Sequence, residues 1–251
     1  MIDAHCHLEQ KDYDPDREEV IKRCKELLKA VVFSCAHPRD FETALEIAEK
    51  HRGFVFLTAG IHPEYIKEIS EDEIHSFFGL LRKNRKKLVG LGECGLDYHW
   101  VQEEDWREKQ KKLFRRHISF AKDLGLPLVI HSREAEGDCL DLLEKEGAKN
   151  VLMHFFSDKD LAERAIEDGY FISVNTLVLK SKSIRKILKK TPLERLMTET
   201  DAPWLGFGKR NEPIAVKEVI EKISELERIP FEEIDKATTN NARRFFGLKD
   251  I

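Results

Sequence analysis

The sequence lacks paired cysteines, and this absence excludes two common ways of stabilising a fold. Its cysteines are odd in number and none belongs to a Cys-x-x-Cys pair; they are Cys6, Cys24, Cys35, Cys94 and Cys139. A disulfide framework or a thiolate zinc site is therefore not expected, and the pattern favours a reducing, cytoplasmic environment.

Long apolar runs and a surplus of basic residues are absent as well. No run of about 18 apolar residues is present, so we expect no membrane span. The first residues, Met-Ile-Asp-Ala-His, lack the basic and apolar regions of a signal peptide, so we expect none. The formal net charge is −4, whereas a dedicated nucleic-acid binder is more often basic. Contact with nucleic acid would therefore need a local patch or bound metal.

What the chain does have is a regular alternation of short apolar runs with charged amphipathic segments. Runs such as 30–34 (AVVFS) are apolar without alternation, which is typical of strands buried on both faces of a parallel sheet. We expect strands at 1–5, 30–34, 53–60, 87–91, 127–130, 150–153, 169–174 and 195–198. Helices are expected near 15–29, 39–50, 70–84, 103–124, 133–146, 158–167, 180–189 and 211–228, with a further helix near 231–246.

The number and order of these segments predict the fold. The 251 residues match the length of one (β/α)₈ barrel, about 250 residues, although two small domains would also fit. Strands that alternate with helices favour an α/β fold with parallel pairing. We therefore predict a closed (β/α)₈ TIM-type barrel in a single domain of residues 1–251, with an open doubly wound sheet as the alternative.

Two histidines follow the first predicted strand in the segment Asp3-Ala-His-Cys-His7. Residues two apart in a strand face the same side, so the rings of His5 and His7 can converge on one cation. Asp3 has the same parity and could orient a ligating ring, whereas Cys6 would point into the core. Taken alone, the two histidines could equally be surface residues.

Four more residues stand at or just after the ends of predicted strands: Glu93 among glycines, His131, His154 and Asp201. Each has a plainer interpretation alone: an exposed turn glutamate, a hydrogen-bonded structural histidine, or an aspartate that starts a turn. In a barrel, however, the carboxyl ends of the strands carry the chemistry, and these residues end strands four, five, six and eight. Nitrogen and oxygen ligands without thiolates suit Zn, Mn, Mg or Fe.

Eight short segments together resemble the TatD family of metal-dependent hydrolases, within the amidohydrolase-like barrels. They appear in the family's order and are DAHCHL (3–8), GIHP (60–63), GLGECGLDY (90–98), HSREA (131–135), HFF (154–156), ETDAPWL (199–205), NEP (211–213) and TNNAR (239–243). The resemblance implies a TIM-type barrel that cleaves DNA as a 3′–5′ exonuclease or at apurinic sites.

The resemblance also implies a centre of two divalent cations, Mg²⁺, Mn²⁺ or Zn²⁺. Its ligands would be His5, His7, Glu93, His131, His154 and Asp201. Glu93 would bridge the ions, and Asp201 would take a proton from the attacking water. His62 lies near the metal centre in the family and would touch a substrate phosphate. The segment 206–210 is shorter than in many family members, and it borders the expected substrate cleft.

Further substrate contacts and alternatives follow from the same residues. Arg133, Lys209 and Arg210 are candidates for phosphate contacts, and Trp204 for stacking on a base. Each could instead be solvated or pack at the barrel rim.

The net negative charge and the short segment 206–210 also suit an amidohydrolase or esterase that acts on a small molecule. A non-catalytic scaffold in protein export is the third hypothesis, and a monomer is the default state.

Overall fold

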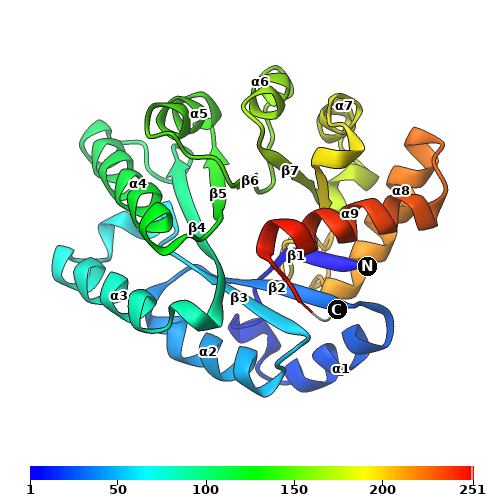
Figure 1. Ribbon diagram of the computed structural model, residues 1–251, viewed down its shortest axis with the longest axis horizontal. Helices are drawn as coiled ribbons and strands as arrows, with labels where there is room; N and C mark the ends of the chain where they lie inside the picture. Colours follow the sequence, from blue (N-terminus) through cyan, green and yellow to red (C-terminus); the bar gives the residue numbers. More distant parts are fainter. Residues whose placement is uncertain (250) are drawn as a thin grey trace.

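Eight parallel strands follow one another around a single sheet, in the order β1 to β8, in the computed structural model, which describes residues 1–249 and 251 (Figure 1). The strands are β1 (Ile2–Cys6), β2 (Ala30–Cys35), β3 (Val55–Ala59), β4 (Leu88–Asp97), β5 (Leu128–Arg133), β6 (Val151–Met153), β7 (Phe171–Val174) and β8 (Leu196–Thr198). This arrangement, with helices between the strands, confirms the predicted (β/α)₈ TIM-type fold.

The helices lie outside the sheet; the first seven connect successive strands, and the last two follow β8 (Figure 1). They are α1 (Arg17–Leu27), α2 (Phe41–Lys50), α3 (Glu71–Lys83), α4 (Glu104–Leu124), α5 (Glu136–Lys145), α6 (Ala162–Glu167), α7 (Lys182–Lys190), α8 (Val216–Glu227) and α9 (Phe231–Phe246). No helix among the described residues is long and apolar enough to cross a membrane. The cytoplasmic location stays a prediction.

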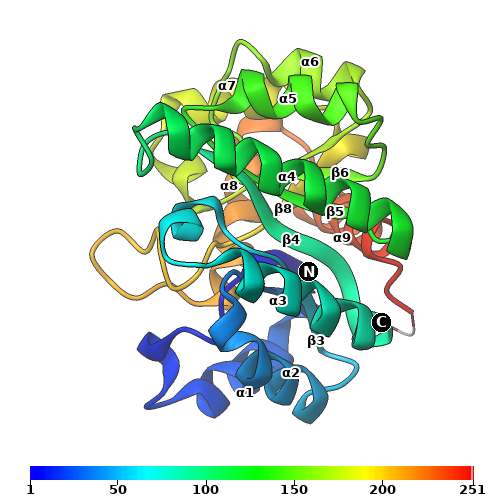
Figure 2. The same cartoon turned by 90° about the vertical axis from the view of Figure 1, so that its left-hand side faces the viewer.

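The first and last strands meet through the segment that follows β8. The Asp201 N–H donates to the His5 carbonyl at 3.0 Å, and the His7 N–H donates to the Ala202 carbonyl at 2.7 Å. These two bonds join the ends of the sheet, so residues from the beginning and the end of the chain lie side by side. Seen from the side, the loop after β8 projects away from the C-terminus (Figure 2).

Strand residues alternate between two apolar clusters. Val129, Leu152 and Met197 belong to a smaller cluster that also holds Ala242 and Phe246 of α9. Their neighbours along each strand belong to a larger cluster shared with the other helices. Because apolar side chains cover both faces of each strand, the strands have continuous apolar sequences instead of alternating ones.

β4 is longer than the sequence predicted, because it continues past residue 91 to Asp97. Two glycines, Gly92 and Gly95, allow the longer strand because they have no Cβ. A Cβ on Gly92 would lie 2.3 Å from the Val129 carbonyl oxygen, and a Cβ on Gly95 would lie 2.0 Å from the His131 carbonyl oxygen. Both glycines have positive φ, 137° and 145°, which side chains disfavour. Glu93 therefore lies within a strand, not after one.

Other boundaries also differ from the prediction. β5 extends to Arg133, so His131 lies inside the strand, and α5 starts only at Glu136. α6 and α8 are shorter than the predicted ranges 158–167 and 211–228. The predicted helices at these three places start too early, because residues there belong to loops between strand and helix on the side of the barrel where the cleft opens.

Candidate metal centre

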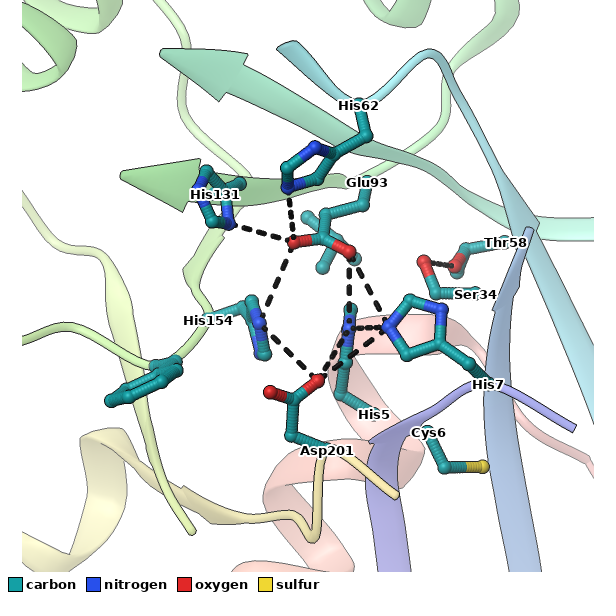
Figure 3. A network of polar contacts seen from close by, with 12 residues as sticks. His5, Cys6, His7, Ser34, Thr58, His62, Glu93, His131, His154 and Asp201 are labelled. Carbon is teal, nitrogen blue, oxygen red and sulfur yellow. Dashed lines mark hydrogen bonds and ion pairs between the residues drawn. The ribbon is translucent and has the colours of Figure 1, made fainter. Parts of the chain in front are cut away.

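Four donor atoms converge in one place (Figure 3). Three come from the seam of the barrel, where β1 meets the segment that follows β8, and the fourth comes from β4. His5 Nε2 and His7 Nε2 lie 3.0 Å apart. Glu93 Oε2 is 3.4 Å from the first nitrogen and 3.5 Å from the second. Asp201 Oδ1 is 3.8 Å from His5 Nε2 and 3.5 Å from His7 Nε2. The backbone bonds that close the barrel hold these residues together.

A second group of donors surrounds the other oxygen of the same glutamate. Glu93 Oε1 is 2.9 Å from His131 Nδ1 and 3.5 Å from both His154 Nε2 and His62 Nε2. Asp201 Oδ1 lies 3.8 Å from His154 Nε2 and so stands between the two groups. The two oxygens of Glu93 thus face different sets of histidines (Figure 3).

These donors fit divalent cations. Ligands at about 2.0–2.2 Å from a common ion are separated from one another by roughly 3.0–3.5 Å, close to the distances observed. His5 Nε2 and His7 Nε2 face each other at 3.0 Å, where only one ring could donate a hydrogen to the other. A cation between the rings would satisfy both nitrogens, and nitrogen with carboxylate oxygen suits Zn, Mn or Mg.

The thiols near the centre point elsewhere. Cys6 Sγ lies 3.7 Å from the Val32 carbonyl oxygen, and Cys94 Sγ lies 3.9 Å from that of Val129. Both cysteines are fully buried in the larger apolar cluster. The centre is therefore built from imidazoles and carboxylates, and the prediction that Cys6 packs in the core is confirmed.

Two carboxylates that the sequence analysis did not single out contact the ring nitrogens of His131 and His154 that face away from Glu93. Asp97 Oδ2 lies 2.9 Å from His131 Nε2, and Glu199 Oε2 lies 2.9 Å from His154 Nδ1. A carboxylate on the far nitrogen fixes the tautomer and orientation of a ligating ring. Asp97 shares a strand face with Glu93, four residues earlier, so the alternation would have revealed it if β4 had been drawn to its full length.

Asp3 does not orient a histidine ring, contrary to the prediction. In the pairing of β1 with β2, Asp3 is opposite Val31 and Cys6 is opposite Phe33, so β1 carries one extra residue between them. This bulge breaks the alternation on which the prediction depended. The Asp3 carboxylate instead accepts hydrogen bonds from the His5 N–H at 3.2 Å, the Thr200 N–H at 3.0 Å and the Thr200 hydroxyl at 2.5 Å.

The carboxylates raise the proton affinity of two buried rings. Burial opposes the charged form of His131, but Asp97 and Glu93 raise its pKa to about 9. Burial likewise opposes protonation of His154, but Glu199 and Glu93 raise its pKa to about 8. At neutral pH these rings carry protons until a cation replaces them.

The pKa values of His62 and Glu93 are lowered, not raised. Burial and the neighbouring His131 lower the pKa of His62 to about 3, so its ring is neutral. Burial disfavours the charge on Glu93, but the surrounding histidines, His62 and His154 first, hold its pKa well below the usual range. Burial also lowers the pKa of His5, so the centre combines an ionised glutamate with two neutral histidines that face it.

Known proteins are similar to this chain over nearly its whole length. A family model described as TatD related DNase matches residues 2–247. The chain belongs to the TatD family. It is 36% identical to the metal-dependent hydrolase YabD of Bacillus subtilis, over 99% of each chain, and 31% identical to the deoxyribonuclease TATDN3 of Homo sapiens, over 98% of this chain and 94% of that one.

A solved structure agrees. The TatD homologue YjjV of Escherichia coli K12 superposes with a TM-score of 0.90 at 28% identity, covering 98% of each chain. The family resemblance seen in the sequence is thus confirmed, and this TatD-family protein is a metal-dependent hydrolase.

A cleft of about 960 Å³ opens over the centre. Three of the residues predicted to contact substrate line it: His62, Arg133 and Trp204. Trp204 is 47% exposed, and its ring meets that of His7 edge-on at 4.7 Å between centroids. Trp100 also lines the cleft, 59% exposed, beneath the Arg133 guanidinium at 5.4 Å. The TatD-type centre thus has aromatic side chains at its rim.

The other two predicted phosphate contacts lie outside the cleft. Arg210 makes two bonds of 2.6 Å to the Asp16 carboxylate and a third of 3.2 Å to Glu212, above the Tyr13 ring. These nearby carboxylates hold the guanidinium on the side of the barrel. Lys209 is exposed but does not line the cleft. Neither cation of the segment 206–210 therefore lines the cleft in this structure.

Removing bound metal is expected to lower the melting temperature. An ion that binds only the native state stabilises it by about 2.7 kcal/mol when its free concentration is about 100 times Kd. For a chain of this size that corresponds to roughly 5–10 °C. Differential scanning calorimetry with and without chelator tests this, and adding Mn²⁺ back should restore the difference. An unchanged melting temperature after verified metal removal would contradict it.

Proposed function

We propose that the protein is a two-metal deoxyribonuclease that hydrolyses phosphodiester bonds. The observation that supports this best is Glu93, which turns one carboxylate oxygen to His5 and His7 and the other to His131 and His154. A carboxylate so placed can bridge two cations. The substrate is inferred from the family match and from the relative in Homo sapiens, which is named a deoxyribonuclease.

In this proposal each donor group holds one cation. His5, His7 and Asp201 hold the first, His131 and His154 hold the second, and Glu93 serves both. Bound cations would supply Lewis-acid polarisation of the phosphate and a lowered pKa for the attacking water. Asp201 has one oxygen, Oδ1, among the histidines, and its carboxylate would be the group to accept a proton from the attacking water.

His62 would bind the substrate phosphate as a neutral donor. Its Nδ1 accepts a hydrogen bond from the Glu64 N–H at 3.2 Å, so the ring hydrogen of the neutral form is on Nε2. Nε2 faces the centre, 3.5 Å from Glu93 Oε1. A neutral N–H there can donate to a non-bridging phosphate oxygen without competing with the cations for the carboxylates.

Cleavage of a labelled single-stranded DNA oligonucleotide tests the proposal. We expect Mg²⁺ or Mn²⁺ to support cleavage and a chelator to abolish it. Products that shorten one nucleotide at a time from a 5′-labelled strand would indicate a 3′–5′ exonuclease, and a single cut at an abasic site would indicate an apurinic-site phosphodiesterase. If protein with verified metal content leaves every oligonucleotide intact, the proposal is wrong.

A metal-dependent amidohydrolase or esterase for small molecules is the second candidate. It is favoured by the charge of the cleft, where carboxylates outnumber lysine and arginine. The lining carboxylates are Glu64, Glu93, Asp97, Glu134, Glu136, Asp158, Asp160 and Asp201, whereas the lining cations of that kind are Arg133 and Lys159. A panel of amides, esters and lactones assayed beside DNA separates the two candidates.

A further inference from the structure

Exposed lysines follow one face of α7, the helix whose Ser183 lies at the edge of the cleft. Lys182, Lys186 and Lys189 are exposed and recur at the spacing of one helix face, while Ile184 and Ile187 are buried on the opposite face. Ser183, in the first turn of α7, lines the cleft. The basic face of α7 therefore begins at the cleft and leads away from it.

An aromatic side chain from the loop after β8, Phe207, lies beside Lys180, two residues before α7 begins. Lys180 Nζ lies 3.8 Å from the centroid of the Phe207 ring, and Phe207 is 41% exposed. The Thr176 hydroxyl donates to the Leu205 carbonyl at 2.8 Å, which holds the loop after β8 against the segment that leads to Lys180. The same loop carries Trp204, whose exposed ring lines the cleft.

The charges on this side of the cleft are available to a partner. Among the described residues, no carboxylate oxygen lies within 4.0 Å of the ammonium nitrogens of Lys180, Lys182 and Lys186. By contrast, Lys190 at the far end of α7 pairs with Glu163 at 3.6 Å. Since Arg133 and Lys159 are the only arginine and lysine among the described residues that line the mostly acidic cleft, further cations for the phosphates of a long substrate are best supplied from beside it.

We propose that Lys180, Lys182, Lys186 and Phe207 form a track, the α7 track, that binds the strand of a single-stranded nucleic acid as it leaves the metal centre. The inference rests on the proposed nuclease function and adds the path of the substrate. Lysines separated by four helical residues lie about 6 Å apart along the helix axis and contact successive parts of the backbone. Exposed aromatic faces accept bases without regard to sequence.

The test compares two charge reversals of equal size. Lys182→Glu combined with Lys186→Glu changes the track, and Lys83→Glu combined with Lys86→Glu is the control. Lys83 ends α3 and Lys86 follows it, at the end of the barrel away from the cleft. Both proteins are assayed on a single-stranded DNA of about 20 nucleotides, a length that exceeds typical single-strand site sizes, and on the small diester bis(4-nitrophenyl) phosphate.

The track variant should lose efficiency only on the long substrate. We expect kcat/KM for the oligonucleotide to fall about tenfold at low salt. The slope of its logarithm against the logarithm of salt concentration should also become shallower by about 1.4, since each of the two lost phosphate contacts on a single strand contributes about 0.7. Hydrolysis of the small diester should be unchanged. Phe207→Leu should raise KM for the oligonucleotide by about fivefold through lost stacking, again without an effect on the small diester.

The outcomes separate this inference from the proposed function. If the track variant cleaves the oligonucleotide as efficiently as the wild type, or if the control variant loses as much efficiency as the track variant, the α7 track is overturned. The proposed nuclease function is unaffected by either result. An equal loss on the small diester also overturns the α7 track, because the lysines would then act on the centre itself. Wild-type protein that neither cleaves the oligonucleotide nor binds it in fluorescence anisotropy overturns both.

Discussion

Glu93→Ala is expected to lose both metal ions and nearly all hydrolytic activity. One oxygen of this carboxylate faces His5 and His7 and the other faces His131 and His154, so a single substitution removes a ligand from both groups. Lewis-acid stabilisation of the transition state contributes several kcal/mol, so the rate should fall roughly 10³-fold or more. Elemental analysis of the purified variant and kcat on the preferred substrate measure the two effects.

A matched control for this variant is Glu134→Gln. Glu134 also lines the cleft, but its carboxylate contacts His99 at 2.8 Å and none of the proposed ligands. Removing the same charge there should leave metal content and rate within about twofold, as is usual for a surface substitution. If Glu93→Ala kept full metal stoichiometry and rate, the bridging assignment would be refuted.

Metal affinity is expected to weaken steeply as the pH falls. His131 and His154, with pKa values of about 9 and 8, carry protons below those values and must release them before their nitrogens bind a cation. Each competing proton weakens binding by up to about tenfold per pH unit, so these two give up to about 100-fold for each unit below about pH 8. His7 adds to this dependence, because Asp201 and Glu9 raise its pKa well above the usual value despite burial. Isothermal titration with Mn²⁺ between about pH 6 and pH 8 measures this dependence.

Variants of the supporting carboxylates identify which protons compete. Asp97→Asn removes the charge that contacts His131 Nε2, and Glu199→Gln removes the one that contacts His154 Nδ1. Each variant should lower the pKa of the histidine that its carboxylate contacts. The loss of metal affinity that is due to that one proton should then begin at a lower pH than in the wild type. A metal affinity that does not change with pH in the wild type would mean that these rings are neutral without a cation or are not ligands.

The fold and the six proposed ligands were predictable from the sequence because they depend on simple periodicities. Buried parallel strands leave continuous apolar runs, and the ends of those runs mark where a barrel gathers polar residues. His154 and Asp201 follow their strands as predicted. Glu93 and His131 were also identified correctly as neighbours, although both lie inside strands that run further than expected.

What the sequence did not reveal depends on local departures from those periodicities. The bulge in β1 turned Asp3 toward Thr200, and the glycines of β4 lengthened that strand and hid Asp97 as a partner of His131. Arg210 was a candidate for a phosphate contact, and nothing in the sequence indicated its ion pair with Asp16, which is far away in the chain. Ion pairs between distant segments leave no periodic signal.

The seam between β1 and β8 also affects when the centre can form as the chain is synthesised. His5 and His7 emerge from the ribosome first, but Asp201 and the backbone bonds that fix it against them come only after β8. Glu93 on β4, His131 on β5 and His154 directly after β6 all lie in the middle of the chain. Because chains begin to fold from the N-terminus during synthesis, an ion captured early would be held by this middle group, and the group at the seam would be completed last.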